Sequence, residues 1–373
     1  MANVYTPGLK VTARTVVKKT RRLPIFGQVL VKVGQRVGAT DIVARTDLPG
    51  KVYPANIANA LGVMPDEVPT AMMKKPSDAI TKGEVIAETK GMFGFFKGQY
   101  QAPIDGTVDN ISHITGQVML RENPIPVTVQ AYVDGTVAEI LEREGVVVQT
   151  VATFVQGIFG LSGEAHGPLR RIAERPDAIV AESAIDESCR GKVLIAGSFA
   201  PLSLLKKAIA VGARGLVVGG FDYNDIKELL GKDLGVAITG GEKLGTTLVV
   251  TEGFGRIAMA QRTFDLLAQN EGRIASINGA TQIRAGVIRP EIIVPLEGVS
   301  AEGHHEAPLV GLEVGAPVRC IRFPYFGKLG RVTALPSELA KMESETMVRV
   351  MEVTFDEGGK AIVPRANVEA IEG

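Results

Sequence analysis

The sequence predicts a multi-domain α+β protein with three parts: an all-β N-terminal part, a central α/β part built on a parallel sheet, and a small C-terminal β-barrel. The length of 373 residues is enough for two or three domains. The 43 Gly and 20 Pro residues punctuate short Val/Ile-rich runs, which is typical of strands joined by tight turns. Only the stretch from about residue 175 to 295 places apolar residues at helical spacing between its strands. We therefore expect parts at 1–168, 169–297 and 298–373.

Composition narrows the class of protein. The 41 Lys and Arg residues balance 41 Asp and Glu residues, which argues against a uniformly basic nucleic-acid binder but leaves room for a local basic patch. The 2 Cys residues lie far apart, so neither a disulfide framework nor a zinc finger is expected. We expect a cytoplasmic protein, because its start has no apolar signal core and no apolar run is long enough to span a bilayer.

The N-terminal part contains two internal repeats. Residues 33–46 (VGQRVGATDIVART) are partly echoed by residues 80–89 (ITKGEVIAET). Residues 102–111 (APIDGTVDNI) match residues 131–140 (AYVDGTVAEI). In the second pair, Asp-Gly followed by alternating apolar residues predicts a tight turn that leads into a half-buried strand. Between the repeats, the apolar residues of 57–63 predict a short helix.

These repeats resemble the barrel-sandwich hybrid of biotinyl/lipoyl-like domains over much of residues 25–150. In carrier members of that family, a lysine at a hairpin tip is modified, which would make Lys90 the attachment point of an acyl or carboxyl carrier. The sequence there, Glu88-Thr89-Lys90-Gly91, lacks the Asp of lipoyl domains and runs on into the apolar loop 92–96. The alternative implied by the resemblance is an unmodified barrel used as a scaffold.

The first strands are rich in cations. Lys10, Arg14, Lys18, Lys19, Arg21 and Arg22 all precede the first acidic residue, Asp41. Such a patch favours an interaction arm for an acidic protein or a nucleic acid. A strand edge kept soluble by its charges is the alternative.

The central part alternates strands and helices, which predicts a parallel sheet. We expect strands at 192–196, 215–218, 235–238, 246–250 and 288–294, and helices at 202–211, 222–230 and 256–269. Ligands of open α/β sheets bind at the carboxyl ends of the strands, so Thr251, Gly253 and Gly255 could hold an anion before the last helix. An enzyme or enzyme subunit with a small-molecule site at this loop is the main rival hypothesis.

The C-terminal part shows five short strands, at 317–322, 330–334, 347–355, 360–363 and 368–371, which suggest a closed barrel. The stretch 318–332 resembles the KOW motif, with Gly330 at the motif's central glycine. The resemblance implies an SH3-like barrel that binds RNA or protein. The contacts that it implies are Arg319, Arg322, Tyr325, Phe326, Lys328 and Arg331.

These observations favour a non-enzymatic scaffold or adaptor over an enzyme. Its β modules would dock a protein assembly or RNA of the ribosome or transcription type, with the KOW-like loop as the contact. Neither His166 nor the pair His304 and His305 has the spacing of a metal or catalytic set, so we expect no metal site, no cofactor and no assignable catalytic residue. The sequence leaves open whether the chain forms a homo-oligomer.

Overall fold

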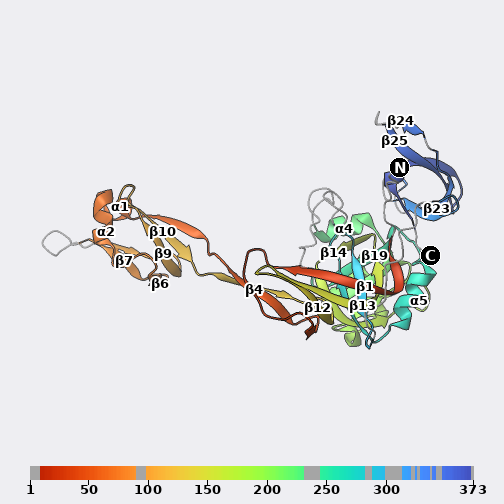
Figure 1. Ribbon diagram of the computed structural model, residues 1–373, viewed down its shortest axis with the longest axis horizontal. Coiled ribbons are helices and arrows are strands. Elements are labelled where there is room, and N and C mark those ends of the chain that lie inside the picture. Colours follow the sequence, from red (N-terminus) through yellow and green to blue (C-terminus); the bar gives the residue numbers. More distant parts are fainter. Residues whose placement is uncertain are drawn as a thin grey trace.

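A computed structural model describes residues 9–89, 98–230, 244–281, 288–298, 313–320, 324–325, 328–336, 338–341 and 347–370. The described chain is mostly β, at 48% strand and 15% helical, and forms several sheets. The molecule is elongated: a narrow two-stranded arm leaves the body on one side and carries a small unit at its far end, and the C-terminal part lies on the opposite side of the body (Figure 1).

The body is built on one mixed sheet with the order β14-β19-β18-β16-β15-β20-β21-β13-β12-β3. Its four central strands β15, β16, β18 and β19 are parallel neighbours, as the alternating pattern predicts. The strands from the middle of the chain are β14 (Phe159–Leu161), β15 (Glu164–Arg171), β16 (Val193–Ile195), β17 (Phe199–Ala200), β18 (Gly215–Phe221), β19 (Thr247–Phe254), β20 (Ile274–Asn278) and β21 (Glu291–Pro295).

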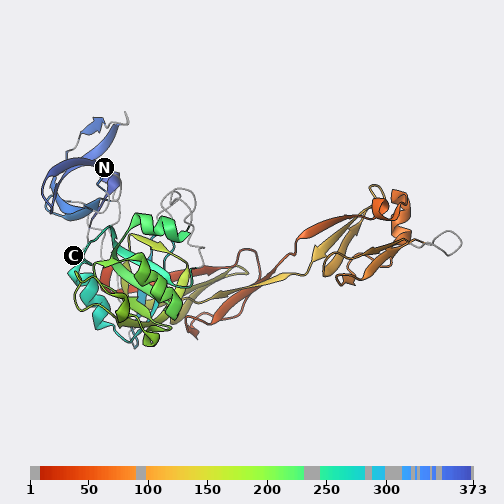
Figure 2. The same cartoon turned by 180° about the vertical axis from the view of Figure 1, so that it is seen from behind.

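Three helices and two short turns accompany these strands. They are η2 (Glu182–Ala184), η3 (Glu187–Cys189), α3 (Leu202–Val211), α4 (Tyr223–Leu230) and α5 (Gln261–Gln269). Viewed from behind, the green helical segments cover this face of the body (Figure 2). Helix α3 ends as expected at Gly212, which adopts the left-handed conformation with φ 80°. Helix α5 begins later than expected, because the Glu252 carboxylate accepts the Ala260 N–H and fixes the start of the helix there. The expected strand 235–238 lies outside the described residues.

The expected boundary between residues 168 and 169 falls inside β15. This strand pairs with β16 on one edge and with β20 on the other. The long strand β13 (Gly145–Gln156) pairs with β21 through Ala152 to Gln156, so strands of the N-terminal segment continue the same sheet. The physical reason is a shared core: Val155 of β13 is buried with residues of β16, β18 and β19.

Two units with the same strand pairing make up the N-terminal segment. The root unit joins the body and contains β1 (Val11–Arg22), β2 (Gln28–Val29), β3 (Arg36–Val37), β4 (Ile42–Leu48), β11 (Ile125–Gln130), β12 (Gly135–Leu141) and β13. The distal unit contains β5 (Val52–Asn56), α1 (Ile57–Leu61), η1 (Pro65–Glu67), α2 (Val68–Ala71), β6 (Ala79–Ile80), β7 (Val85–Glu88), β8 (Gln99–Gln101), β9 (Gly106–Ile111) and β10 (Gln117–Glu122). Each unit has its own hydrophobic core.

The pairing registers of the two units coincide. Gly135 pairs with Val37 in the root unit, as Gly106 pairs with Ile80 in the distal unit. The hairpins β4–β11 and β7–β8 also carry a bulge at the same step.

The turns of the two units are held in the same way. The Asp134 Oδ1 accepts the Ala39 N–H at 2.7 Å, and the Asp105 Oδ1 accepts the Lys82 N–H at 2.8 Å. The repeats seen in the sequence therefore occupy equivalent positions. The distal unit sits at the end of the root unit's hairpin, which forms the arm (Figure 1).

The C-terminal part is one antiparallel sheet around a small core. It contains β22 (Pro317–Cys320), β23 (Leu329–Ala334), β24 (Leu339–Lys341), β25 (Met347–Phe355), β26 (Lys360–Pro364), η4 (Arg365–Asn367) and β27 (Val368–Ala370). The strand order is β24-β25-β23-β22-β27, with β26 also on β25. Over the described residues the pairing does not return on itself, so the expected closed barrel is a curled, open sheet here.

Candidate functional site

The arm joins the body through two short connectors, residues 38–41 and 131–134. They bond to each other: the Ala131 N–H donates to the Asp41 carbonyl at 2.9 Å, and the Tyr132 N–H donates to the Ala39 carbonyl at 2.8 Å. Strand β4 of the arm also pairs with β2. The connectors and this pairing together hold the arm at the body.

Tyr132 is the central residue of the junction. Its backbone has φ 73°, a left-handed conformation that costs a bulky residue about 1–2 kcal/mol. Its ring is buried, and its hydroxyl donates to Glu291 Oε1 of β21 at 3.1 Å. Burial, followed by the negative charges of Glu291 and Glu164, raises the pKa of Tyr132 well above its usual value. The hydroxyl therefore keeps its proton and serves as a donor.

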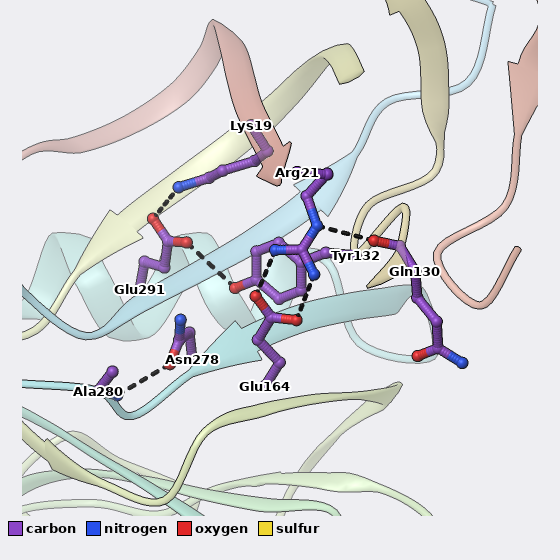
Figure 3. A network of polar contacts seen from close by, with 8 residues as sticks. All are labelled: Lys19, Arg21, Gln130, Tyr132, Glu164, Asn278, Ala280 and Glu291. Carbon is purple, nitrogen blue, oxygen red and sulfur yellow. Dashed lines mark hydrogen bonds and ion pairs between the residues drawn. The ribbon is translucent and has the colours of Figure 1, made fainter. Parts of the chain in front are cut away.

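Two cations of β1 complete the network around this ring (Figure 3). The Arg21 guanidinium lies 5.2 Å from the Tyr132 ring centroid and donates to both oxygens of Glu164 at 2.5 and 2.8 Å. Its Nε donates to the Gln130 carbonyl, the last residue of the arm strand β11, at 2.7 Å. Lys19 forms an ion pair with Glu291. We define these residues, Lys19, Arg21, Gln130, Tyr132, Glu164 and Glu291, as the root network.

The root network joins three parts of the chain: β1, the arm, and the body strands β15 and β21. The side chains of the Lys19–Glu291 pair are 23% and 11% exposed, so solvent screens this pair less than a surface pair. The Arg21–Glu164 pair is more open, at 15% and 38%. Sequence reasoning missed this role. The available signal was the alternation of Lys19 and Arg21, which puts both side chains on one face of a strand. Of the remaining N-terminal cations, Arg14, Lys18 and Arg22 are exposed.

A groove of about 1010 Å³ opens beside the same junction. Its floor is formed by Gln149, Thr150 and Val151 of β13. Its walls carry two arginines and two carboxylates, together with small and apolar residues. The wall residues are Arg36, Val37, Gly38, Asp134, Gly135, Thr136, Ala138, Gly272, Arg273, Ile274, Pro295, Leu296, Glu297 and Gly298.

In the loop expected to hold an anion, the Gly255 N–H already donates to the Phe221 carbonyl at 3.0 Å. Arg319 of β22 forms an ion pair with Glu252 and donates to the Thr251 carbonyl at 3.1 Å. Both side chains are almost fully buried, at 4% and 3% exposure. The prediction that Arg319 contacts a partner is therefore wrong for this structure, because its cation already neutralises Glu252.

Close packing accounts for the glycines around this loop. A Cβ on Gly220 would lie 2.0 Å from the Gly255 carbonyl oxygen, so the two backbones can approach only without a side chain. Gly253 and Gly255 have φ of 154° and 104°, in a region that L-residues rarely adopt. Thr251 is buried, and its hydroxyl donates to the Val218 carbonyl at 3.3 Å.

The structure brings two of the predicted KOW-like contacts, Tyr325 and Lys328, to one aromatic ring. The half-buried Tyr325 packs on Phe355, with ring centroids 5.1 Å apart. Lys328 is exposed, lies 5.6 Å from the same ring and is 3.5 Å from Glu357. Arg331 is exposed and donates to the Gly315 carbonyl at 3.2 Å. Arg322 and Phe326 lie outside the described residues, as does Lys90.

The described ranges contain no group of three or more His, Cys, Asp or Glu side chains arranged to hold a metal ion. None of the helices in those ranges combines the length and the apolar character that crossing a membrane requires. Known proteins give no further guidance, since no protein-family model and no curated protein matches the chain.

Proposed function

We propose that this protein is a non-enzymatic scaffold or adaptor that docks a protein assembly or an RNA-containing machine. The distal unit, held away from the body on the arm, is one docking module, and the C-terminal sheet is the other. The observation that carries the proposal is the root network. In it, two cations, two carboxylates and a tyrosine with a left-handed backbone link the arm to the body. A fixed arm is useful for presenting a module at a set distance and angle.

Finer fold assignments belong to the same proposal. The nested units would be barrel-sandwich hybrids that resemble biotinyl/lipoyl-like domains, and the repeated hairpin with its Asp-Gly turn supports this. The C-terminal sheet would be a KOW-like SH3-type module. Gly330 supports this assignment, because a Cβ there would lie 2.4 Å from the Thr354 carbonyl oxygen, so the motif's central glycine is required by packing.

The ribonucleoprotein or protein partner would contact the C-terminal sheet at the exposed cations Lys328 and Arg331. The enzyme hypothesis has weaker support, because Glu252, beside the loop at which a small molecule would bind, is buried against Arg319. The carrier hypothesis makes a separate prediction. The intact mass of the native protein would exceed the sequence mass by a lipoyl or biotinyl group on Lys90, whereas a scaffold has the sequence mass.

An arm deletion tests the proposal. Leu48 and Ile125 are direct partners at the end of the β4–β11 pair, so residues 49–124 can be replaced by an Asn-Gly turn without changing the register. Full-length and armless proteins, together with a Lys328→Glu/Arg331→Glu variant, would be used for affinity purification from native cells with and without RNase. Lys207→Ala, an exposed change on α3, is the control.

We expect the full-length protein and the Lys207→Ala control to retain the same partners. Some of these partners should be lost from the armless protein, from the charge-reversal variant or from both. Loss of those partners after RNase treatment would identify an RNA-containing machine. Identical partner sets for all four proteins would contradict the proposal.

A further inference from the structure

The groove beside the arm root forms where the body sheet divides. Strand β1 pairs with β13 along Gly145 to Val155 and so occupies one whole edge of β13. Both β12, on Gly145–Gln149, and β21, on Ala152–Gln156, must therefore lie on the other edge. The two strands diverge at Thr150 and Val151, which form the floor of the groove. One wall continues through β12 to β3, and the other continues through β21 to β20.

The two walls carry matching chemistry. Arg36 lies on β3, two strands out from β13, and Arg273 directly precedes β20, two strands out on the other wall. Each wall also has one carboxylate, Asp134 on the arm side and Glu297 on the body side. Among the described residues, the Arg36 guanidinium and the Glu297 carboxylate have no hydrogen-bond or ion-pair partner, and both side chains are exposed. Ile274, at 43% exposure, adds an apolar surface.

The distal unit shows whether the fold itself requires a charge at the position of Arg36, because the two units share the same strand pairing. Arg36 pairs with Thr136, and the equivalent pair in the distal unit is Ala79 with Thr107. The distal unit thus adopts the same register without a cation at this position. The residue equivalent to Gln149 is Arg121, which is held by Asp109 at 2.9 Å. Strand pairing therefore does not require Arg36, and its exposed guanidinium is available to a ligand in the groove.

We infer that the groove binds an extended polypeptide segment that carries both acidic and basic side chains. Two arginines and two carboxylates on facing walls complement mixed charge, whereas a polyanion such as RNA would be repelled by Asp134 and Glu297. The Gln149 amide and the Thr136 hydroxyl can bond to a peptide backbone, and Ile274 can contact an apolar side chain. The inference is independent of the partner of the arm, because the armless protein keeps every residue of the groove.

Selection from a phage-displayed library of random peptides on the full-length protein tests this inference. A synthetic peptide of the enriched consensus would be titrated by fluorescence anisotropy against the full-length protein and its Arg36→Ala, Glu297→Ala and Lys207→Ala variants. Fluorescein-labelled oligouridylate is the RNA probe in the same assay. Thermal unfolding of each variant reports whether it remains folded.

We expect a consensus with both charge signs. The affinity should fall about tenfold or more in Arg36→Ala and in Glu297→Ala, and stay unchanged in Lys207→Ala. The inference would be overturned if the affinity of the consensus peptide were unchanged in both Arg36→Ala and Glu297→Ala. The absence of any enriched peptide, or RNA binding that is lost in Arg36→Ala and strengthened in Glu297→Ala, would also overturn it.

Discussion

At the scale of single residues, charges that resemble a binding patch are used to hold the chain together. Lys19 and Arg21 belong to a cation-rich segment, yet they face Glu291 and Glu164 inside the molecule. Arg319 lies on β22, in a stretch with the composition of an RNA contact, yet it is buried against Glu252. In each case a nearby carboxylate, distant in sequence, determines the role of the cation.

The hydroxyl of Tyr132 gives the first prediction at this scale. Tyr132→Phe removes its hydrogen bond to Glu291 and should destabilise the root unit by about 1 kcal/mol near neutral pH. The raised pKa of Tyr132 sets the sign of the pH dependence. Above the ordinary tyrosine pKa of about 10, the unfolded chain releases the proton while the native chain keeps it, so stability falls by up to about 1.4 kcal/mol per pH unit.

Amide exchange in β12 and β13 of the wild-type protein and of Tyr132→Phe, measured between about pH 8 and pH 11, reports the difference in stability between the two proteins. The advantage of the wild-type chain over Tyr132→Phe should be constant below about pH 10 and shrink above it. An advantage that grows with pH would contradict the assigned shift. An equal response in both proteins would show that Tyr132 does not titrate in this way.

The buried ion pair gives the second prediction. Arg319→Ala leaves the Glu252 carboxylate buried without its cation, which should cost about 3–5 kcal/mol. Arg331→Ala, an exposed change in the same sheet, should cost no more than about 0.5 kcal/mol. Thermal unfolding of both variants measures the difference. Similar melting temperatures would mean that the ion pair does not attach the C-terminal sheet to the body.

At the scale of elements, the nested duplication explains how an arm arises from ordinary parts. In both units a hairpin leaves the same position, after an acidic turn residue and beside an Asp-Gly turn. In the distal unit this hairpin is β7–β8. In the root unit it is β4–β11, and the distal unit is inserted at its end. The arm is thus a lengthened hairpin of a repeated unit.

Gly106 tests the independence of the distal unit. Its φ is 156°, and a Cβ would lie 1.8 Å from the Arg121 carbonyl oxygen, so Gly106→Ala must displace β10. We expect a cost above the about 1–3 kcal/mol of ordinary overpacking, seen as lost amide protection in β6, β9 and β10. Gly98→Ala, where the nearest atom would be 3.4 Å away, is the control in the same unit. Equal loss of protection in β18 and β19 would show that the distal unit and the body unfold together.

Local patterns predicted the elements better than they predicted the site. The spacing of Leu202, Leu205 and Ala208, closed by Gly212, was sufficient for helix α3. The repeats pointed to equivalent turns, and local bonds from the Gly38 N–H to Asp41 and from the Thr81 N–H to Glu84 hold one part of each turn. The root network and the Arg319–Glu252 pair could not be predicted. Arg319 and Glu252 are 67 residues apart, and Lys19 and Glu291 are 272 residues apart, so only the tertiary fold brings the partners together.

At the scale of the whole molecule, the structure combines a large body with an arm that carries the distal unit. The body contains the largest core and the parallel strands, and the root network fastens the arm to it. The groove lies beside the same junction, so a segment bound there would contact Arg36 and Asp134 next to both arm connectors. We expect the root network to fix the direction of the arm relative to the body.

The distance distribution between spin labels on the arm and the body tests this claim most directly. Both native cysteines are buried, and burial raises the pKa of Cys320 to about 11, so labels would react with introduced Asp47→Cys on β4 and Arg262→Cys on α5. Pulsed electron–electron double resonance should give one narrow distance peak with the native network and a broad distribution after Arg21→Ala. A broad distribution with the native network intact, or a peak unchanged by Arg21→Ala, would contradict the claim.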